Sequence, residues 1–135
     1  MCGIFGIISD CEINRDHLQQ LALHARQRGR DSSGLIYLEE DTFSVRRADY
    51  DINKLFKKYG NIHTHLAMGH SRLITNGLID NQPVVRDGIC VIHNGIIVND
   101  EDIWDTLNLE RLYQIDTEII IGLAIKHLED GGNLE

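Results

Sequence analysis

The sequence predicts an α+β fold built as a single domain. Segments of strand composition fill the middle of the chain and helical patterns lie near both ends, without the strand-helix alternation typical of doubly wound sheets. A length of 135 residues with 42% hydrophobic content suits one core. Neither repeats nor a linker-like segment divides the chain. We therefore expect one layered domain over residues 1–135.

The elements can be predicted in order from spacing and turn residues. They are a strand (3–9), a helix (14–25), two strands (34–40 and 42–49) joined by an acidic turn, a helix (52–60), a strand (65–73), a loop (74–83), strands joined at tight turns (84–100) and a helix (116–130). Asn14 is the expected N-cap of the first helix. Its apolar face should comprise Leu18, Leu21, Ala22 and Ala25.

The charge balance and the cysteine pattern exclude several classes of function. A net charge of −8 without any Lys/Arg-rich block argues against nucleic-acid and anionic-membrane partners. No apolar run approaches the ~20 residues of a membrane span, and the N-terminus lacks the features of a signal peptide. Cys2, Cys11 and Cys90 form no CxxC pair, which fits a reducing compartment. We expect a cytoplasmic protein in which Cys90 is a buried, inert thiol.

Cys2 is the first candidate for chemistry, because it directly follows the initiator methionine in "MCGIFGI". Once Met1 is removed, one residue carries a thiol and a free α-amine. An α-amine titrates at about 7.7 to 8.0 and can act as the base that a cysteine thiol needs. The alternative is that Cys2 is a small residue that opens a strand.

Asn94 and Gly95, in "HNGII", allow two interpretations. Asn-Gly between apolar segments is the usual sequence of a type I′ hairpin turn. The side-chain amide of Asn94 and the backbone N–H of Gly95 could instead stabilise a developing negative charge, as an oxyanion hole does.

Arg72 and Asp116 are candidate substrate ligands with equally plain structural interpretations. Arg72 in "GHSRLITNG" follows a strand and is either a solvated strand-end residue or a fork for a carboxylate. Asp116 in "QIDTEIII" is either a helix N-cap or a counter-ion for an ammonium group. Together the two side chains could hold both ends of an α-amino acid.

A metal site is a competing hypothesis for the histidines in "IHTHLAMGH". His63 and His65 would share one strand face, whereas His70 would point the opposite way. We expect solvated or hydrogen-bonded histidines and no metal, although a histidine metal protein stays open until an elemental analysis is made.

Five segments in order, "MCGIFGI", "RGRDSSG", "GHSRLITNG", "HNGII" and "DTE", resemble the glutaminase domain of class II glutamine amidotransferases. The resemblance covers nearly the whole chain. It implies an N-terminal nucleophile hydrolase fold, an αββα sandwich of two antiparallel sheets between helical layers. It also implies hydrolysis of the glutamine side-chain amide, with ammonia passed to an acceptor, and requires no cofactor or metal.

The resemblance also implies roles for individual residues. Cys2 matches the nucleophile, whose α-amine accepts a proton and returns it to the leaving ammonia, and a γ-glutamyl thioester then hydrolyses to glutamate. Asn94 and Gly95 match the oxyanion hole.

Three further positions match the substrate-binding residues of the family. Arg72 matches the ligand of the glutamine α-carboxylate, Asp116 that of the α-ammonium, and Thr75 lies at a substrate-pocket position. Departures affect the acceptor reaction. "RGRDSSG" and "HNGII" are most similar to glucosamine-6-phosphate synthases, but Leu73 and Asn76 stand where those have tryptophan and histidine, and "RLI" and "NQPV" resemble asparagine synthetases.

The resemblance implies partners as well as a substrate. L-glutamine is the expected substrate, and an ammonia-accepting synthase domain or subunit is the expected partner; a homo-oligomer stays open. Glutaminase domains of this family continue past the length of this chain, so residues 1–135 are expected to be an incomplete glutaminase domain without a synthase domain. Two alternatives remain: a non-catalytic glutamine-binding or assembly module that keeps Met1, and an amide hydrolase of the same nucleophile class with a different substrate.

Overall fold

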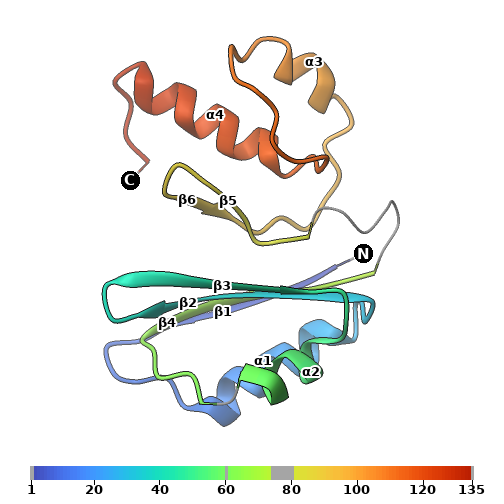
Figure 1. The fold of residues 1–135 in the computed structure, drawn as a ribbon, viewed down its shortest axis with the longest axis vertical. Helices are drawn as coiled ribbons and strands as arrows, with labels where there is room; N and C mark the ends of the chain where they lie inside the picture. Colours follow the sequence, from blue (N-terminus) through green and yellow to red (C-terminus); the bar gives the residue numbers. More distant parts are fainter. Residues whose placement is uncertain (1, 60, 74–80, 135) are drawn as a thin grey trace.

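The fold is a four-layer sandwich, seen in a computed structural model that describes residues 2–59, 61–73 and 81–134. One sheet is packed against α1 (Arg15–Arg26) and α2 (Ile52–Tyr59). A second, smaller sheet is packed against α4 (Glu118–Glu129), which also contacts the short helix α3 (Asp100–Trp104). Figure 1 shows the two sheets facing each other between these helical layers, which confirms the predicted αββα arrangement.

The first sheet has four antiparallel strands in the order β1-β4-β2-β3. These are β1 (Gly3–Ile8), β2 (Ser32–Glu39), β3 (Thr42–Ala48) and β4 (Leu66–Arg72). The strand β4 is central: it pairs Gly3 with Ser71 on one side and Ser32 with Arg72 on the other. The N-terminal end of β1 and the C-terminal end of β4 therefore lie together, between the two halves of the molecule (Figure 1).

The second sheet is the hairpin of β5 (Val84–Arg86) and β6 (Ile89–Val91). Its two-residue turn is Asp87-Gly88, and both residues have positive φ, 50° and 78°. This is the backbone that a type I′ turn requires, and glycine adopts it without strain. The predicted turn at Asn94-Gly95 is wrong, because the chain leaves the sheet after Val91 and forms no strand over residues 92–99.

The half of the molecule made of the four-stranded sheet, α1 and α2, here called the first half, holds the larger apolar core. The second half comprises the β5–β6 hairpin, α3 and α4. Leu18, Leu35, Ile52 and Phe56 belong to a cluster between the four-stranded sheet and its two helices. The face of α1 is as predicted except for Leu21, which is 37% exposed at the edge of the buried stripe. Asn14 caps this helix by accepting from the backbone N–H groups of residues 16 and 17, as predicted.

Other boundaries differ from prediction where long-range contacts decide them. The strand β2 starts at Ser32, two residues before the predicted strand, because its first residues pair with the end of β4. The helix α3 was not predicted. The predicted end of α2 at Gly60 lies outside the described residues. None of the helices in the described part of the chain has the length and apolar character needed to cross a membrane.

Candidate functional site

A cavity of about 600 Å³ lies where the two halves meet, at the end of the four-stranded sheet. Its lining includes Cys2, Arg72, Asn94, Gly95 and Asp116. The first two residues belong to the half with the large core, and the other three belong to loops of the second half. The structure thus brings together every described residue that the sequence singled out for the site. Thr75 lies outside the described residues.

Cys2 directly precedes β1 and is half-buried in the wall of this cavity. Its backbone N–H donates to Asn94 Oδ1 over 3.1 Å. Because this donor faces the amide oxygen, the NH₂ end of Asn94 is directed elsewhere and can donate. Gly3 allows α1 to approach closely, since a Cβ on it would lie 2.1 Å from the carbonyl oxygen of Ala25. The start of β1, directly after Cys2, is therefore packed against the backbone at the end of α1.

Arg72 ends β4, and the segment "RGRDSSG" packs against this strand end. The backbone N–H of Asp31 donates to the carbonyl of Arg72 over 3.0 Å, and Ser71 Oγ donates to the carbonyl of Gly29 over 2.7 Å. A Cβ on Gly29 would lie 2.2 Å from the backbone nitrogen of Leu73. The segment that contains Gly29 and Asp31, about 40 residues earlier in the chain, therefore helps to hold the end of β4 that carries Arg72.

Asn94 and Gly95 lie exposed in the loop over residues 92–97. A Cβ on Gly95 would come within 2.5 Å of Nε2 of His93, so the loop backbone folds closely over this ring. The hairpin interpretation of "HNGII" is therefore wrong, and the loop instead presents a side-chain amide and a glycine backbone to the cavity.

Asp116 lies in the turn that leads into α4. Its Oδ2 accepts from the backbone N–H of Ile97 over 2.8 Å. The helix begins two residues later, at Glu118, so the interpretation of Asp116 as its N-cap is wrong. The carboxylate instead links the turn before α4 to the loop that carries Asn94.

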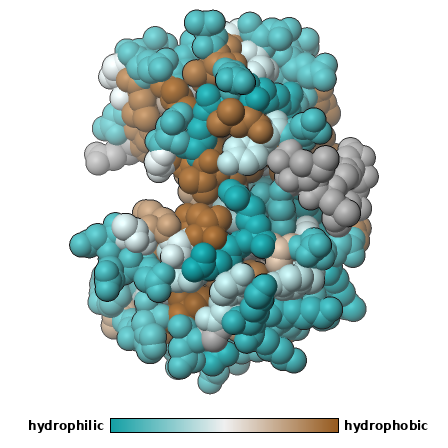
Figure 2. All heavy atoms as spheres, viewed as in Figure 1, coloured by the Kyte–Doolittle hydropathy of each residue, from teal (hydrophilic) through white to brown (hydrophobic). Residues whose placement is uncertain are grey.

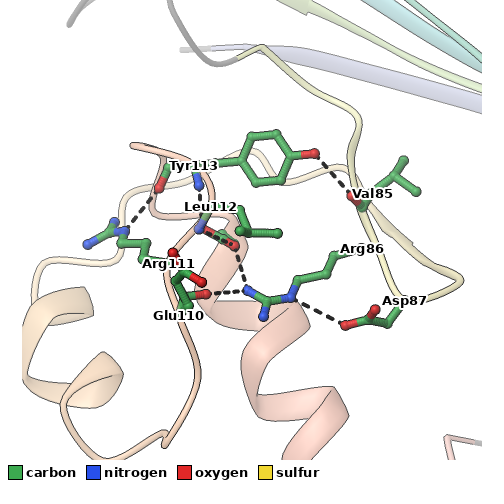
Figure 3. Close-up of polar contacts among 8 residues, drawn as sticks. Val85, Arg86, Asp87, Glu110, Arg111, Leu112 and Tyr113 are labelled. Carbon is green, nitrogen blue, oxygen red and sulfur yellow. Dashed lines mark hydrogen bonds and ion pairs between the residues drawn. The ribbon is translucent and has the colours of Figure 1, made fainter.

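Glu118 is fully buried and fixes the segment that leads to Asp116. It pairs with Arg86 Nη1 over 3.0 Å and accepts from the backbone N–H groups of Leu112 and Tyr113. Figure 3 shows the Arg86 guanidinium reaching the carbonyl of Glu110 in the same network. A buried carboxylate with a cationic partner and two amide donors is well satisfied. No role was predicted for Glu118, although it is the last residue of the "DTE" motif.

His70 is fully buried in β4, and neither ring nitrogen has a hydrogen-bond partner among the described residues. Burial is the main cause that lowers its pKa to about 4, and the nearby Arg72 and His93 contribute to this shift. His63 instead bonds to Glu12 at the surface over 2.6 Å, and His65 is exposed. In the described ranges no three His, Cys, Asp or Glu side chains are grouped as a metal site requires.

The other two cysteines lie away from this cavity. Cys90 is half-buried, less than predicted, and its burial raises the pKa of the thiol to about 11 against the opposing effect of Arg47. It lines a second, apolar cavity of about 560 Å³ with residues such as Ile4 and Met68. Figure 2 shows apolar residues gathered at the hollow between the two halves. Cys11 is exposed, and its Sγ lies 3.4 Å from Ser9 Oγ.

Several lining residues were not predicted to belong to the site, among them Gln82, His93 and Asp100. Gln82 stands in "NQPV", which was predicted to be loop and was noted as similar to asparagine synthetases, with no role given to Gln82 itself. A polar side chain directly before the only proline of the chain was the available signal, but nothing in the sequence indicated its partners.

The chain is similar in sequence to the glutamine–fructose-6-phosphate aminotransferases (isomerizing). It is 36% identical to that of Campylobacter jejuni over 132 residues, 91% of this chain and 22% of the relative. It is 32% identical to that of Thermococcus kodakarensis over 149 residues, 100% of this chain and 24% of the relative. The chain thus spans about a quarter of the length of the curated relatives it matches. No family model matches it.

A solved structure shows the same fold. Glutamine phosphoribosylpyrophosphate amidotransferase from B. subtilis, complexed with ADP and GMP, matches 93% of this chain and 29% of its own with a TM-score of 0.75 at 23% identity. The resemblance to class II glutaminase domains is confirmed. The predicted N-terminal nucleophile hydrolase fold of such a glutaminase domain is confirmed with it.

Proposed function

We propose that this glutaminase-like domain hydrolyses the side-chain amide of glutamine and releases ammonia to an acceptor on another domain or chain. The observation that carries the proposal is that residues from both halves line the same cavity: Cys2, Arg72, Asn94, Gly95 and Asp116. Its volume of about 600 Å³ is ample for one amino acid. The acceptor domain or subunit is part of the proposal, as is the cytoplasmic location that the cysteine pattern predicts.

The proposed reaction begins once Met1 has been removed. The α-amine of Cys2 takes the thiol proton, and the thiolate attacks the side-chain carbonyl carbon of glutamine. The negative charge moves to the carbonyl oxygen, where Asn94 Nδ2 and the Gly95 backbone N–H would donate hydrogen bonds. The hydrogen bond from the Cys2 nitrogen to Asn94 Oδ1 supports the role of Asn94 Nδ2 as a donor, because it leaves the NH₂ group of the side chain directed away from the Cys2 nitrogen.

Collapse of this intermediate breaks the carbon–nitrogen bond, and the α-ammonium of Cys2 gives its proton to the leaving ammonia. A γ-glutamyl thioester remains on Cys2. Water, deprotonated by the α-amine, attacks the thioester and releases glutamate with the thiol restored. The atoms of one glutamine and one water are accounted for in glutamate and ammonia.

The head group of glutamine is assigned to Arg72 and Asp116. A guanidinium can hold the α-carboxylate through two hydrogen bonds, and a carboxylate can hold the α-ammonium. Analogues that lack one charge leave a partner unpaired in the cavity and should bind poorly. Glutaramic acid lacks the α-amine and 4-aminobutanamide lacks the α-carboxylate. Hydrolysis of either as fast as glutamine would favour the different amide hydrolase and contradict these two roles.

The deciding experiment is the intact mass of the protein with and without 6-diazo-5-oxo-L-norleucine, a glutamine analogue that alkylates nucleophilic cysteines, followed by peptide mapping. We expect loss of Met1 and one adduct, on Cys2. Cys11→Ala is the matched control because it removes an exposed thiol outside the cavity and should keep the adduct. Cys2→Ala should lose both the adduct and glutamine hydrolysis. A retained Met1 without an adduct contradicts the proposal and favours the binding module.

A further inference from the structure

Gln82 connects the two loops that carry Asn94 and Asp116. Its side chain is only 4% exposed, and both polar atoms are in use. Oε1 accepts from the backbone N–H of His93 over 2.7 Å, and Nε2 donates to Thr117 Oγ1 over 2.9 Å. His93 directly precedes Asn94 and Thr117 directly follows Asp116. One carboxamide is therefore bonded to the residue before Asn94 and to the residue after Asp116.

The backbone of Gln82 is itself held by the first half. Its N–H donates to Asn81 Oδ1 over 2.9 Å, and Asn81 Nδ2 donates to the carbonyls of Ser33 and Ala48 over 2.9 and 3.0 Å. A Cβ on Gly34 would lie 1.8 Å from the carbonyl oxygen of Gln82, so β2 contacts this backbone directly. The position of Gln82 is thus set by the sheet that also carries Cys2 and Arg72.

We propose that Gln82 is a positioning residue that sets the place of Asn94, Gly95 and Asp116 relative to Cys2. The inference rests on the proposed glutaminase function and assigns a role to a residue for which neither the motifs nor the family resemblance gave one. Gln82 acts through the His93 backbone and the Thr117 hydroxyl. Its two bonds reach different site residues, so they have separable kinetic effects.

The bond to His93 affects the chemical step. Without Oε1, the backbone N–H of His93 loses its fixed acceptor, and Asn94 and Gly95 shift relative to Cys2. Displacing a group that acts in the transition state by about 1 Å costs about a hundredfold in rate. The bond to Thr117 affects substrate binding instead, because it fixes the turn that carries Asp116. Losing one hydrogen bond there weakens glutamine binding roughly fivefold to tenfold.

Steady-state glutamine hydrolysis by the full chain, with kcat and KM measured separately, tests this division. Gln82→Met keeps the length of the side chain and removes both bonds, and we expect kcat to fall about a hundredfold. Thr117→Val keeps the bond to His93, so KM should rise while kcat stays within about twofold of wild type. Thr117→Ser keeps the hydroxyl and should restore the wild-type KM.

Thr64→Val is the matched control, because Thr64 is also a buried threonine with hydrogen bonds, here to the backbone of Leu66. It should leave kcat and KM unchanged even where urea unfolding shows an equal loss of stability. If Gln82→Met does not unfold cooperatively, the Thr117→Val and Thr117→Ser pair decides. An unchanged KM in Thr117→Val then overturns the inference.

The two proposals fail in different ways. If wild type hydrolyses glutamine and Gln82→Met does so with unchanged kcat and KM, the positioning role is overturned and the glutaminase function stands. If processed wild type neither hydrolyses glutamine nor reacts with 6-diazo-5-oxo-L-norleucine, the function is overturned and the role of Gln82 falls with it.

Discussion

The half built from β1–β4, α1 and α2 packs a large apolar cluster that includes Leu35 and Phe56, whereas the half built from β5, β6, α3 and α4 buries a small one around Val84, Ile115 and Ile121. The second half adds polar contacts instead, above all the buried carboxylate of Glu118. Each half contributes part of the candidate site. Apolar packing therefore stabilises the sheet next to which Cys2 lies and in which Arg72 stands, while hydrogen bonds and ion pairs hold the loops opposite them.

The largest expected effect comes from removing the buried carboxylate of the second half. Glu118→Ala leaves Arg86 without its buried partner and leaves two backbone N–H groups without an acceptor, so the free energy of unfolding should fall by about 3–5 kcal/mol. Urea unfolding measures this loss. Relative to wild type, amide hydrogen exchange in Glu118→Ala should accelerate more in α4 than in β2 and β4, because the contacts that are lost belong to the second half.

Glu129→Ala is the matched control for this variant, since Glu129 lies exposed at the end of the same helix. It should change the free energy of unfolding by less than about 0.5 kcal/mol. If Glu118→Ala were no more destabilising than Glu129→Ala, the second half would not depend on its ion pair, and the contrast between the halves would be lost.

Asn94→Ala should separate chemistry from stability within the second half. The residue is exposed, so truncation should scarcely alter the free energy of unfolding. Loss of an oxyanion donor should nevertheless lower kcat about a hundredfold to a thousandfold. Glutamine turnover and urea unfolding are measured on the same sample. Asn108→Ala, at another exposed loop asparagine, should leave both unchanged, and a kcat for Asn94→Ala near that of wild type would remove Asn94 from the mechanism.

The buried His70 should make the protein less stable in acid. Charged or titratable groups of both halves, Arg72 and His93, lie near it. Its pKa is about 4 in the folded protein against 6.5 as the ordinary value, because burial and the nearby Arg72 and His93 disfavour the charged form. The unfolded chain therefore binds the proton first, and stability falls as the pH drops below about 6.5. Between pH 7.5 and pH 5 this residue should cost about 2 kcal/mol.

Urea unfolding at these two pH values checks the expectation. His70→Leu cannot bind the proton, so its stability should depend on pH less than that of wild type by about this amount. His17→Leu, which removes an exposed histidine of α1, should keep the wild-type dependence. An unchanged dependence in His70→Leu would mean that other groups cause the loss in acid.

Local patterns predicted the elements of the first half, because its helices and strands follow apolar spacing and capping residues. Asn14 and the buried face of α1 show this, and so does the two-stranded unit of β2 and β3. The order of five short motifs predicted which residues line one cavity, although the roles of those residues remain predictions. Thr75 stays a prediction altogether.

Contacts between distant segments were not predictable in the same way. The strand was predicted to begin only at residue 34, whereas β2 begins at Ser32, where β4 pairs with it. Asn94-Gly95 has the sequence of a hairpin turn, although the hairpin closes at Asp87-Gly88. Gln82 and Glu118 are single polar letters whose importance comes from partners 11 to 35 and 5 to 32 residues away. Hydrogen bonds of this range leave no periodic signal in the sequence.

The smallest expected effect is the loss of stability when one methylene is removed from each of the two apolar cores. Ile52 and Ile121 are both fully buried, the first in the large cluster and the second in the small one. Ile52→Val should lower the free energy of unfolding by about 1 kcal/mol, within the usual range for this change in a packed core. Ile121→Val should cost less, because partly exposed neighbours can move into the space. Urea midpoints at equal slope measure both, and Ile8→Val, at a side chain 77% exposed, is the control. An Ile121→Val loss as large as that of Ile52→Val would show that the small core is packed as tightly as the large one, so that the second half would not rely mainly on its polar contacts.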